Sequence, residues 1–125
     1  MSEPLIEFRK VCTGYGQMKV LHGIDLTIQE GEIVTLIGSN GAGKTTTLMT
    51  LSGVNRVWDG TIIYDGKSIN SLAAHEIVAA GISHVPEGRQ IFRDLTVLEN
   101  LRLGAFLRND EDGILADLKK SFDMF

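Results

Sequence analysis

The stretch that decides the fold is Gly38-Ser39-Asn40-Gly41-Ala42-Gly43-Lys44-Thr45-Thr46, which fits the phosphate-binding loop pattern G-x-x-x-x-G-K-[ST]. Residues 32–37, just before it, are apolar and β-branched and predict a buried strand. The run after it predicts a helix that buries Leu48 and Leu51 and ends at Gly53. A strand, this loop and a helix, in that order, form the context in which the pattern binds nucleotide phosphates.

The residue types in this loop suit a polyphosphate. Glycine permits backbone turns that point successive N–H groups into one concavity, and the following helix adds unpaired N–H groups and the positive end of its dipole. Lys44 is expected to reach the β- and γ-phosphates, and the Thr45 hydroxyl is expected to ligate Mg²⁺. Thr46 and the backbone of residues 39–43 would complete the cradle.

The composition narrows the class of protein. A length of 125 residues is enough for one domain with a core, and a net charge of −4 gives no support for nucleic-acid binding through a broad basic surface. Cys12 is the single cysteine, so no internal disulfide can form, and a reducing compartment is favoured. A lone thiol in an apolar strand is most often a small core residue. No apolar run approaches the ~18 residues of a membrane helix, and residues 1–4 lack signal-peptide features. We expect a soluble, cytoplasmic protein that is able to dock on a membrane protein.

Strands are predicted in the first half of the chain, outside the loop. Apolar residues alternate with polar ones around residues 6–9 and 24–29, and residues 60–64 form a further apolar run that the turn Asp65-Gly66 closes. Ser71 is expected to cap a short helix over residues 72–80 that stops at Gly81. Residues 82–86 then predict another strand.

Helices are predicted in the last third. Thr96 and Glu99 form a capping box that opens a helix through about Phe106. A final helix begins near Asp110, with Ile114, Leu118 and Phe122 on one face. The chain is therefore predicted to combine an antiparallel β-rich entry, a strand–loop–helix nucleotide unit and a helical tail.

Three residues outside the loop could carry chemistry. Tyr15, in a turn after the first strand, is either an adenine-stacking platform or a partly exposed turn tyrosine. Asp65 is assigned to the turn rather than to a metal site, because Asp-Gly is a strong hairpin signal. Glu87 follows the predicted strand 82–86, where α/β sheets present ligand-facing groups, so it could reach a metal or a water, or be a solvated loop carboxylate.

The remaining polar candidates have simpler interpretations. His22, His75 and His84, expected in a loop, a helix and a strand, lack metal-ligand spacing with one another or with Cys12 and are taken as structural. Arg89 and Arg93 could hold a phosphate or a partner's carboxylate, or be ordinary surface charges.

These features together resemble an ATP-binding subunit of the ABC-transporter family. The resemblance covers essentially all 125 residues but only the N-terminal half of such a subunit. It rests on Tyr15, on residues 21–26 with Gly31-Glu32-Ile33, and on Leu95-Thr96-Val97-Leu98-Glu99-Asn100-Leu101, which is similar to the family's L-T-V-x-E-N-L segment. The run Val85-Pro86-Glu87-Gly88-Arg89-Gln90-Ile91-Phe92 is similar to branched-chain amino-acid importers of the LivF type.

The resemblance implies an α/β fold of the P-loop NTPase, ABC type, truncated after the start of the helical subdomain. Residues 1–86 would form the antiparallel β subdomain and the strand–P-loop–helix core, and residues 87–125 the Q-loop-equivalent region and the first part of the helical subdomain. The cofactors implied are ATP and Mg²⁺. The implied partners are a second, homologous ATP-binding subunit and transmembrane permease subunits, with no nucleic acid and no direct membrane insertion. The implied location is the cytoplasmic face of the cell membrane.

The resemblance also assigns roles to individual residues. Tyr15 would stack on adenine, Lys44 would be catalytic, and Thr45 would ligate the metal. Glu87 stands where most of the family has glutamine, and the LivF-type subunits are similar to this chain in using glutamate there. We therefore expect Glu87 to act near Mg²⁺ and the attacking water, and to tune the affinity for the metal through its added charge.

Some family motifs do not occur in these 125 residues: the LSGGQ-type signature, the acid-ended strand with its catalytic glutamate, and the switch histidine. The expected activity of a full-length dimer is ATP hydrolysis that drives import, whereas the 125-residue chain alone is expected to be inactive and prone to aggregate. Alternatives are a non-hydrolysing nucleotide-binding module, the translation-factor branch of the family, and a small-molecule kinase with the same loop.

Overall fold

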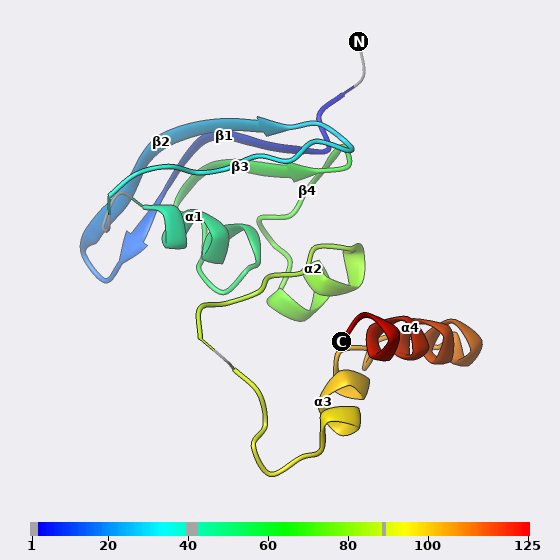
Figure 1. Ribbon diagram of the computed structural model, residues 1–125. Helices are drawn as coiled ribbons and strands as arrows, with labels where there is room; N and C mark the ends of the chain where they lie inside the picture. The colour runs from blue at the N-terminus through cyan, green and yellow to red at the C-terminus, as the bar shows by residue number, and fades with distance from the viewer. Residues whose placement is uncertain (1–2, 40–42, 89) are drawn as a thin grey trace. The chain divides into compact units, whose positions relative to one another are not determined.

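The computed structural model describes residues 3–39, 43–88 and 90–125. The chain divides into two compact units, residues 1–84 and residues 85–125, and each is described by itself (Figure 1). Within the described ranges, every helix is too short or too polar to span a lipid bilayer.

The first unit is built on a four-stranded antiparallel sheet with the order β2-β1-β3-β4. The strands are β1 (Ile6–Tyr15), β2 (Met18–Ile28), β3 (Asp59–Tyr64) and β4 (Lys67–Ser68). Asp65 and Gly66 connect β3 to β4 with φ angles of 49° and 82°, as a two-residue hairpin turn requires, so the predicted turn is confirmed. His22 lies within β2 opposite Cys12 rather than in a loop, which corrects the prediction.

A bulge in β1 keeps the apolar residues of this strand on one face. Phe8 and Val11 are three residues apart, a spacing that would normally place them on opposite faces of the sheet, yet both are fully buried. The register shifts between them, and Lys10 adopts a φ of 51°, so the extra residue returns Val11 to the core side. Gly60 lies beside this bulge, where a Cβ atom would clash with the carbonyl oxygen of Lys10.

Helix α1 (Lys44–Leu51) follows the phosphate-binding loop and packs on one face of the sheet (Figure 1). Its end is as predicted. Gly53 has a φ of 82°, its N–H bonds to the carbonyl of Thr50, and Val54 bonds to that of Met49, which together form a Schellman motif.

The predicted inner face of α1 was partly wrong. Leu51 packs against the core, but Leu48 is 45% exposed, and the buried positions are Thr46, Thr47 and Thr50. A threonine is tolerated there because its hydroxyl can bond to the carbonyl four residues earlier. Thr47 bonds to Gly43 at 2.7 Å and Thr50 bonds to Thr46 at 2.6 Å.

Two predicted strands do not form. Residues 32–37 and 82–86 carry no strand pairing among the described residues, and His84 consequently lies outside any strand. Ile33 and Ile37 are each 94% exposed, and Val85 is 89% exposed, whereas Ile82 belongs to the core. The apolar pattern is typical of strands buried in a parallel sheet, but a strand exists only where a second strand supplies its hydrogen bonds.

Helix α2 (Ala74–Ala80) begins two residues later than predicted. Its N-cap is Ala73, not Ser71, and the Glu76 carboxylate accepts a hydrogen bond from the Ala73 N–H at 3.0 Å. Gly81 ends the helix with a φ of 120°, as predicted. Ile77 projects from α2 into the core formed with the sheet.

The second unit contains α3 (Val97–Leu103) and α4 (Glu111–Met124). The capping box that opens α3 is confirmed: the Glu99 N–H donates to the Thr96 hydroxyl at 3.0 Å, and the Thr96 N–H donates to the Glu99 carboxylate at 2.9 Å. The helix ends at Leu103, earlier than the predicted Phe106, because the backbone continues as turns after Gly104. Helix α4 begins after Asp110, as predicted, and buries Ile114.

Candidate functional site

The phosphate-binding loop ends in a glycine that shapes the start of α1. Gly43 is the N-cap, with φ and ψ angles of 94° and 8°, a left-handed conformation that glycine adopts without strain. It is buried against β2, where a Cβ atom would lie 2.8 Å from a methyl group of Leu21. Gly38 and Ser39 are exposed, and Asn40, Gly41 and Ala42 lie outside the described residues.

The side chain of Lys44 folds back over the loop. Its ammonium group donates a hydrogen bond to the carbonyl oxygen of Gly38 at 2.5 Å. The cation thus lies near the first residue of the loop, where a neutral carbonyl oxygen accepts from it. An anionic ligand in the loop would compete well for this ammonium group, because charge-assisted hydrogen bonds are about twice as strong as those to neutral acceptors.

The two threonines after Lys44 differ in their surroundings. Thr45 is exposed, so its hydroxyl is open to a ligand or a metal ion from solution. Thr46 is only 6% exposed. The first turn of α1 therefore offers one exposed and one largely buried threonine, next to backbone N–H groups without helical partners.

Tyr15 lies next to this turn of the helix. It is the last residue of β1, which corrects its predicted place in the following turn. Its hydroxyl lies 3.2 Å from the Thr46 hydroxyl and donates to the Met49 sulfur at 3.9 Å, while 46% of the residue is exposed. The structure thus brings together two predicted site residues that are 31 positions apart in the sequence.

A buried polar link holds the end of β1 near the segment that follows α1. The hydroxyl of Thr13, which is fully buried, donates to the Arg56 carbonyl, and the Asn55 amide donates to both the Thr13 hydroxyl and the Gly14 carbonyl at 3.5 Å. The sequence analysis did not single out these residues, and their only signal was a threonine at an inward position of an apolar strand. The link fixes the strand end that carries Tyr15.

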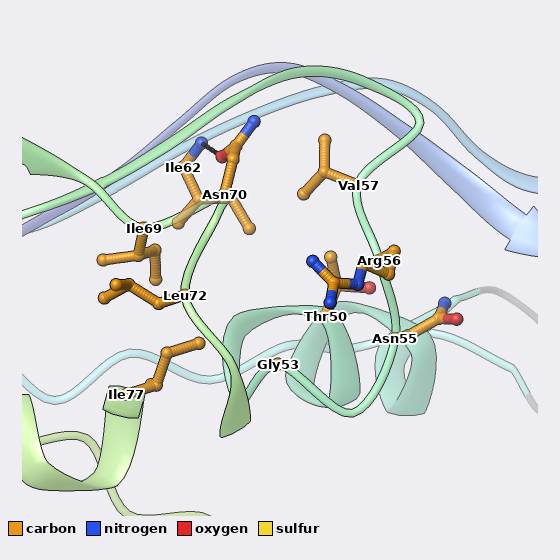
Figure 2. A pocket seen from close by; sticks show the side chains of 10 residues that line it. All are labelled: Thr50, Gly53, Asn55, Arg56, Val57, Ile62, Ile69, Asn70, Leu72 and Ile77. Atoms are coloured by element: carbon orange, nitrogen blue, oxygen red, sulfur yellow. Dashed lines mark hydrogen bonds between the residues drawn. The ribbon is translucent and has the colours of Figure 1, made fainter. Parts of the chain in front are cut away.

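A small cavity of about 10 Å³ lies nearby (Figure 2). Its walls come from α1 and the segment after it, from β3, from the segment between β4 and α2, and from α2: Thr50, Gly53, Asn55, Arg56, Val57, Ile62, Ile69, Asn70, Leu72 and Ile77. Figure 2 shows the hydrogen bond that the Ile62 backbone N–H donates to the side-chain oxygen of Asn70 at 2.9 Å. The side-chain nitrogen of Asn70 also donates to the Gly60 carbonyl at 2.9 Å. A space of this size holds at most one water molecule and excludes a nucleotide.

Glu87 and the nearby arginines belong to the start of the second unit. Glu87 is exposed, and its carbonyl oxygen accepts a hydrogen bond from the Gln90 side chain at 3.3 Å. The role of its carboxylate stays a prediction. Arg93 is exposed, and Arg89 lies outside the described residues.

Among the described residues, the His, Cys, Asp and Glu side chains form no group of three suited to a metal ion. The clearly shifted pKa values belong to charged side chains outside the loop sequence. Arg9 lowers the pKa of Glu7 through a hydrogen bond, and the Thr96 N–H does the same for Glu99. Hydrogen bonds that Arg108 donates to the carboxylates of Asp110 and Asp117 raise the pKa of Arg108. The described part of the loop region thus offers cation and hydroxyl groups for an anion and contains no metal-binding group of three such side chains.

The sequence analysis also missed the role of Asn100. This side chain makes four hydrogen bonds to the backbone of residues 92–96, at distances from 2.9 to 3.4 Å. It therefore holds the segment that leads into α3 in one conformation. The only sequence signal was the position of Asn100 directly after the capping-box glutamate.

Comparisons with known proteins agree with this arrangement. The family described as "ABC transporter" matches residues 21–124. The chain is 43% identical over 121 residues to the high-affinity branched-chain amino acid transport ATP-binding protein BraG of Pseudomonas aeruginosa, covering 97% of this chain and 52% of that protein. It is 39% identical over 106 residues to the lipopolysaccharide export system ATP-binding protein LptB of Haemophilus influenzae, covering 85% and 44%.

A solved structure supports the fold. The structure of cbiO1 from Clostridium perfringens, described as part of the ABC transporter complex cbiONQ, matches with a TM-score of 0.74 and 23% identity, covering 98% of this chain and 50% of that one. At this identity the match shows the fold alone. The chain spans about half the length of the two curated relatives above.

Proposed function

The chain belongs to the ABC transporter family, and from that premise we propose that it binds MgATP as the phosphate-loop part of an importer's ATP-binding subunit. The fold is the ABC type of P-loop fold, with an antiparallel β subdomain and helices, of which this chain represents a part. The similarity to BraG supports branched-chain amino acids as the transported substrates. Transport by the longer protein would be powered by hydrolysis in a dimer of ATP-binding subunits on permease subunits, at the cytoplasmic face of the membrane.

One observation carries the proposal: the Tyr15 hydroxyl lies 3.2 Å from that of Thr46. An aromatic ring, half-exposed and anchored at its hydroxyl end, lies beside the helix that follows the phosphate-binding loop. A nucleotide needs both features at once, since its base gains from stacking on an aromatic face and its phosphates need N–H groups and a cation. A loop that bound only phosphate would not need the ring.

The described part of the loop fits a polyphosphate. Lys44 would exchange the Gly38 carbonyl for the β- and γ-phosphate oxygens, and the buried Gly43 lets the backbone turn into α1. The exposed Thr45 hydroxyl would hold Mg²⁺, and Glu87 would approach the metal and the attacking water in the assembled protein. Bound Mg²⁺ supplies charge neutralisation on the phosphates during in-line attack. Asn40, Gly41 and Ala42 would add backbone N–H groups.

Titration of the 125-residue chain with ATP in the presence and absence of Mg²⁺ tests the proposal. Lys44→Ala should weaken ATP binding at least tenfold, because it removes the only side-chain cation of the loop motif. Lys67→Ala is the matched control, since it removes the same charge from an exposed position in β4 and should leave binding unchanged. Equal affinity in wild type and Lys44→Ala would refute the proposal. We expect the 125-residue chain alone to hydrolyse ATP, measured as phosphate release, no faster than its Lys44→Ala variant.

A further inference from the structure

The hydroxyl groups of Tyr15 and Thr46 form a short chain that ends on a sulfur atom. The hydroxyl oxygens of Tyr15 and Thr46 are 3.2 Å apart, and either hydroxyl can be the donor. Tyr15 also points at the Met49 sulfur, 3.9 Å away. Each hydroxyl carries one proton and two acceptor lone pairs, so the protons of this chain can be arranged in two ways.

In the first arrangement, Thr46 donates to Tyr15, and Tyr15 donates to Met49. In the second, Tyr15 donates to Thr46, and the Thr46 proton is free to point elsewhere. A thioether is a weak acceptor, so little is lost when Tyr15 turns away from Met49. The two arrangements differ only by rotation about two C–O bonds, and no proton leaves its oxygen.

In the second arrangement, the location of Thr46 would let its hydroxyl proton point toward a ligand of the loop. Thr46 lies in the first turn of α1, which has eight residues and follows directly on the loop. Thr46 is only 6% exposed, so bulk water competes poorly for its hydroxyl. The hydroxyl-to-carbonyl bonds of Thr47 and Thr50 keep the neighbouring turns of the helix fixed.

We propose that the Tyr15 hydroxyl is a positioning group for the phosphate cradle, which donates its proton to Thr46 so that Thr46 can donate its own to a bound polyphosphate. This rests on the proposed function, because it assumes that the loop binds a polyphosphate. It adds to that function a hydrogen-bonded link between the ring beside the base and the helix beneath the phosphates. The Tyr15 side chain then acts on phosphate binding even when the ligand has no base.

The test uses inorganic tripolyphosphate and ATP as two ligands for the 125-residue chain and its Tyr15→Phe variant. Phenylalanine keeps the ring and removes only the hydroxyl. We expect both ligands to bind about three- to tenfold more weakly, the size of one neutral hydrogen bond. Tyr64→Phe is the matched control, since Tyr64 is the only other tyrosine and lies in β3; it should leave both affinities unchanged.

A double-mutant cycle assigns the effect to Thr46. In a Thr46→Val background, which keeps the side-chain shape without the hydroxyl, Tyr15→Phe should have no further effect. In a Thr46→Ser background, which keeps the hydroxyl, the effect of Tyr15→Phe should return. Met49→Leu should leave both affinities within twofold of wild type, since it removes only the weak acceptor.

The outcomes separate this inference from the proposed function. Weaker ATP binding with unchanged tripolyphosphate binding would mean that Tyr15 acts on the base alone, and the inference would be wrong. Additive losses in the Thr46→Val cycle would also overturn it, because a purely structural role of Tyr15 does not depend on the Thr46 hydroxyl. A wild-type chain that binds neither ligand would overturn the proposed function, and this inference with it.

Discussion

Asn100 bonds to the backbone of Phe92 through both ends of its amide: its nitrogen donates to the Phe92 carbonyl at 3.0 Å, and its oxygen accepts from the Phe92 N–H at 2.9 Å. The same nitrogen donates to the Thr96 carbonyl at 2.9 Å. One side chain in α3 therefore fixes the backbone of the segment that precedes this helix. Phe92 itself is 63% exposed, so this segment is held by polar bonds more than by burial.

Replacing this amide should free the segment. We expect Asn100→Ala to remove the hydrogen-exchange protection of the Phe92 N–H and to lower the stability of the second unit by about 1–2 kcal/mol. Asn109→Ala is the control, since Asn109 is exposed in the loop before α4, and it should change neither quantity. Unchanged protection at Phe92 in Asn100→Ala would show that other contacts hold this segment.

The bulge in β1 predicts that alanine substitution costs more stability at Gly60 than at Gly23. Gly60 and Gly23 both have positive φ angles, of 86° and 71°, but a Cβ atom clashes with the Lys10 carbonyl only at Gly60. Gly23→Ala should cost about 1–2 kcal/mol from backbone strain. Gly60→Ala should cost about 2–5 kcal/mol, because the clash adds to the same strain. Urea unfolding of both variants measures the difference, and equal costs would contradict the close approach of β3 to the bulge.

The capping box of α3 predicts a dependence on pH. The Thr96 N–H lowers the pKa of Glu99 below its ordinary value of 4.5, so the ionised carboxylate is favoured in the folded state. A lowered pKa means that this stabilisation is present above pH 4.5 and is lost as the pH falls through the folded-state pKa. Proton exchange at the Thr96 N–H should therefore speed up below that pH.

Glu99→Gln is the matched control for this titration. Glutamine keeps a side-chain oxygen that can accept from the Thr96 N–H, but it does not ionise. In this variant the exchange rate of the Thr96 N–H, corrected for its intrinsic pH dependence, should stay constant between pH 3 and pH 6. This range extends about 1.5 pH units on either side of the ordinary glutamate pKa of 4.5. A titration that persists in Glu99→Gln would assign the effect to another group.

The unpaired apolar segments predict the behaviour of the chain in solution. With Ile33 and Ile37 each 94% exposed and Val85 89% exposed, we expect strong binding of the dye ANS and a broad thermal transition. Replacing Ile33 and Ile37 together by threonine should reduce dye binding and raise the temperature at which aggregation begins. The matched control is Ile62→Thr at a buried position, which should lower stability by about 2–4 kcal/mol. A sharp cooperative melt without dye binding would contradict this expectation.

Local signals in the sequence predicted the local structure well. The Asp65-Gly66 turn, the ends of α1 and α2 at Gly53 and Gly81, and the start of α3 at Thr96 are all fixed by a few neighbouring residues. Each depends on glycine conformations or on a side chain that bonds to a nearby N–H. Such features do not require the rest of the fold, so a pattern of four or five letters is enough to find them.

Features that depend on distant partners were harder to predict. Residues 32–37 have the apolar pattern of a strand, but the pattern cannot show whether another strand lies alongside. The inner face of α1 was misjudged because Thr47 and Thr50 satisfy their hydroxyls within the helix and can be buried in place of Leu48. The contact between Tyr15 and Thr46 depends on how β1 lies against α1, which no single segment specifies.

The bulge at Lys10 has a consequence for both ladders of β1. It interrupts the pairing of β1 with β2 and with β3 at nearly the same point, between Phe8 and Val11 in one ladder and between Arg9 and Cys12 in the other. Neither ladder is therefore continuous across this point. The end of the strand that carries Tyr15 is held by the hydrogen bonds of Thr13 to Arg56 and Asn55 as well as by its pairing with β2.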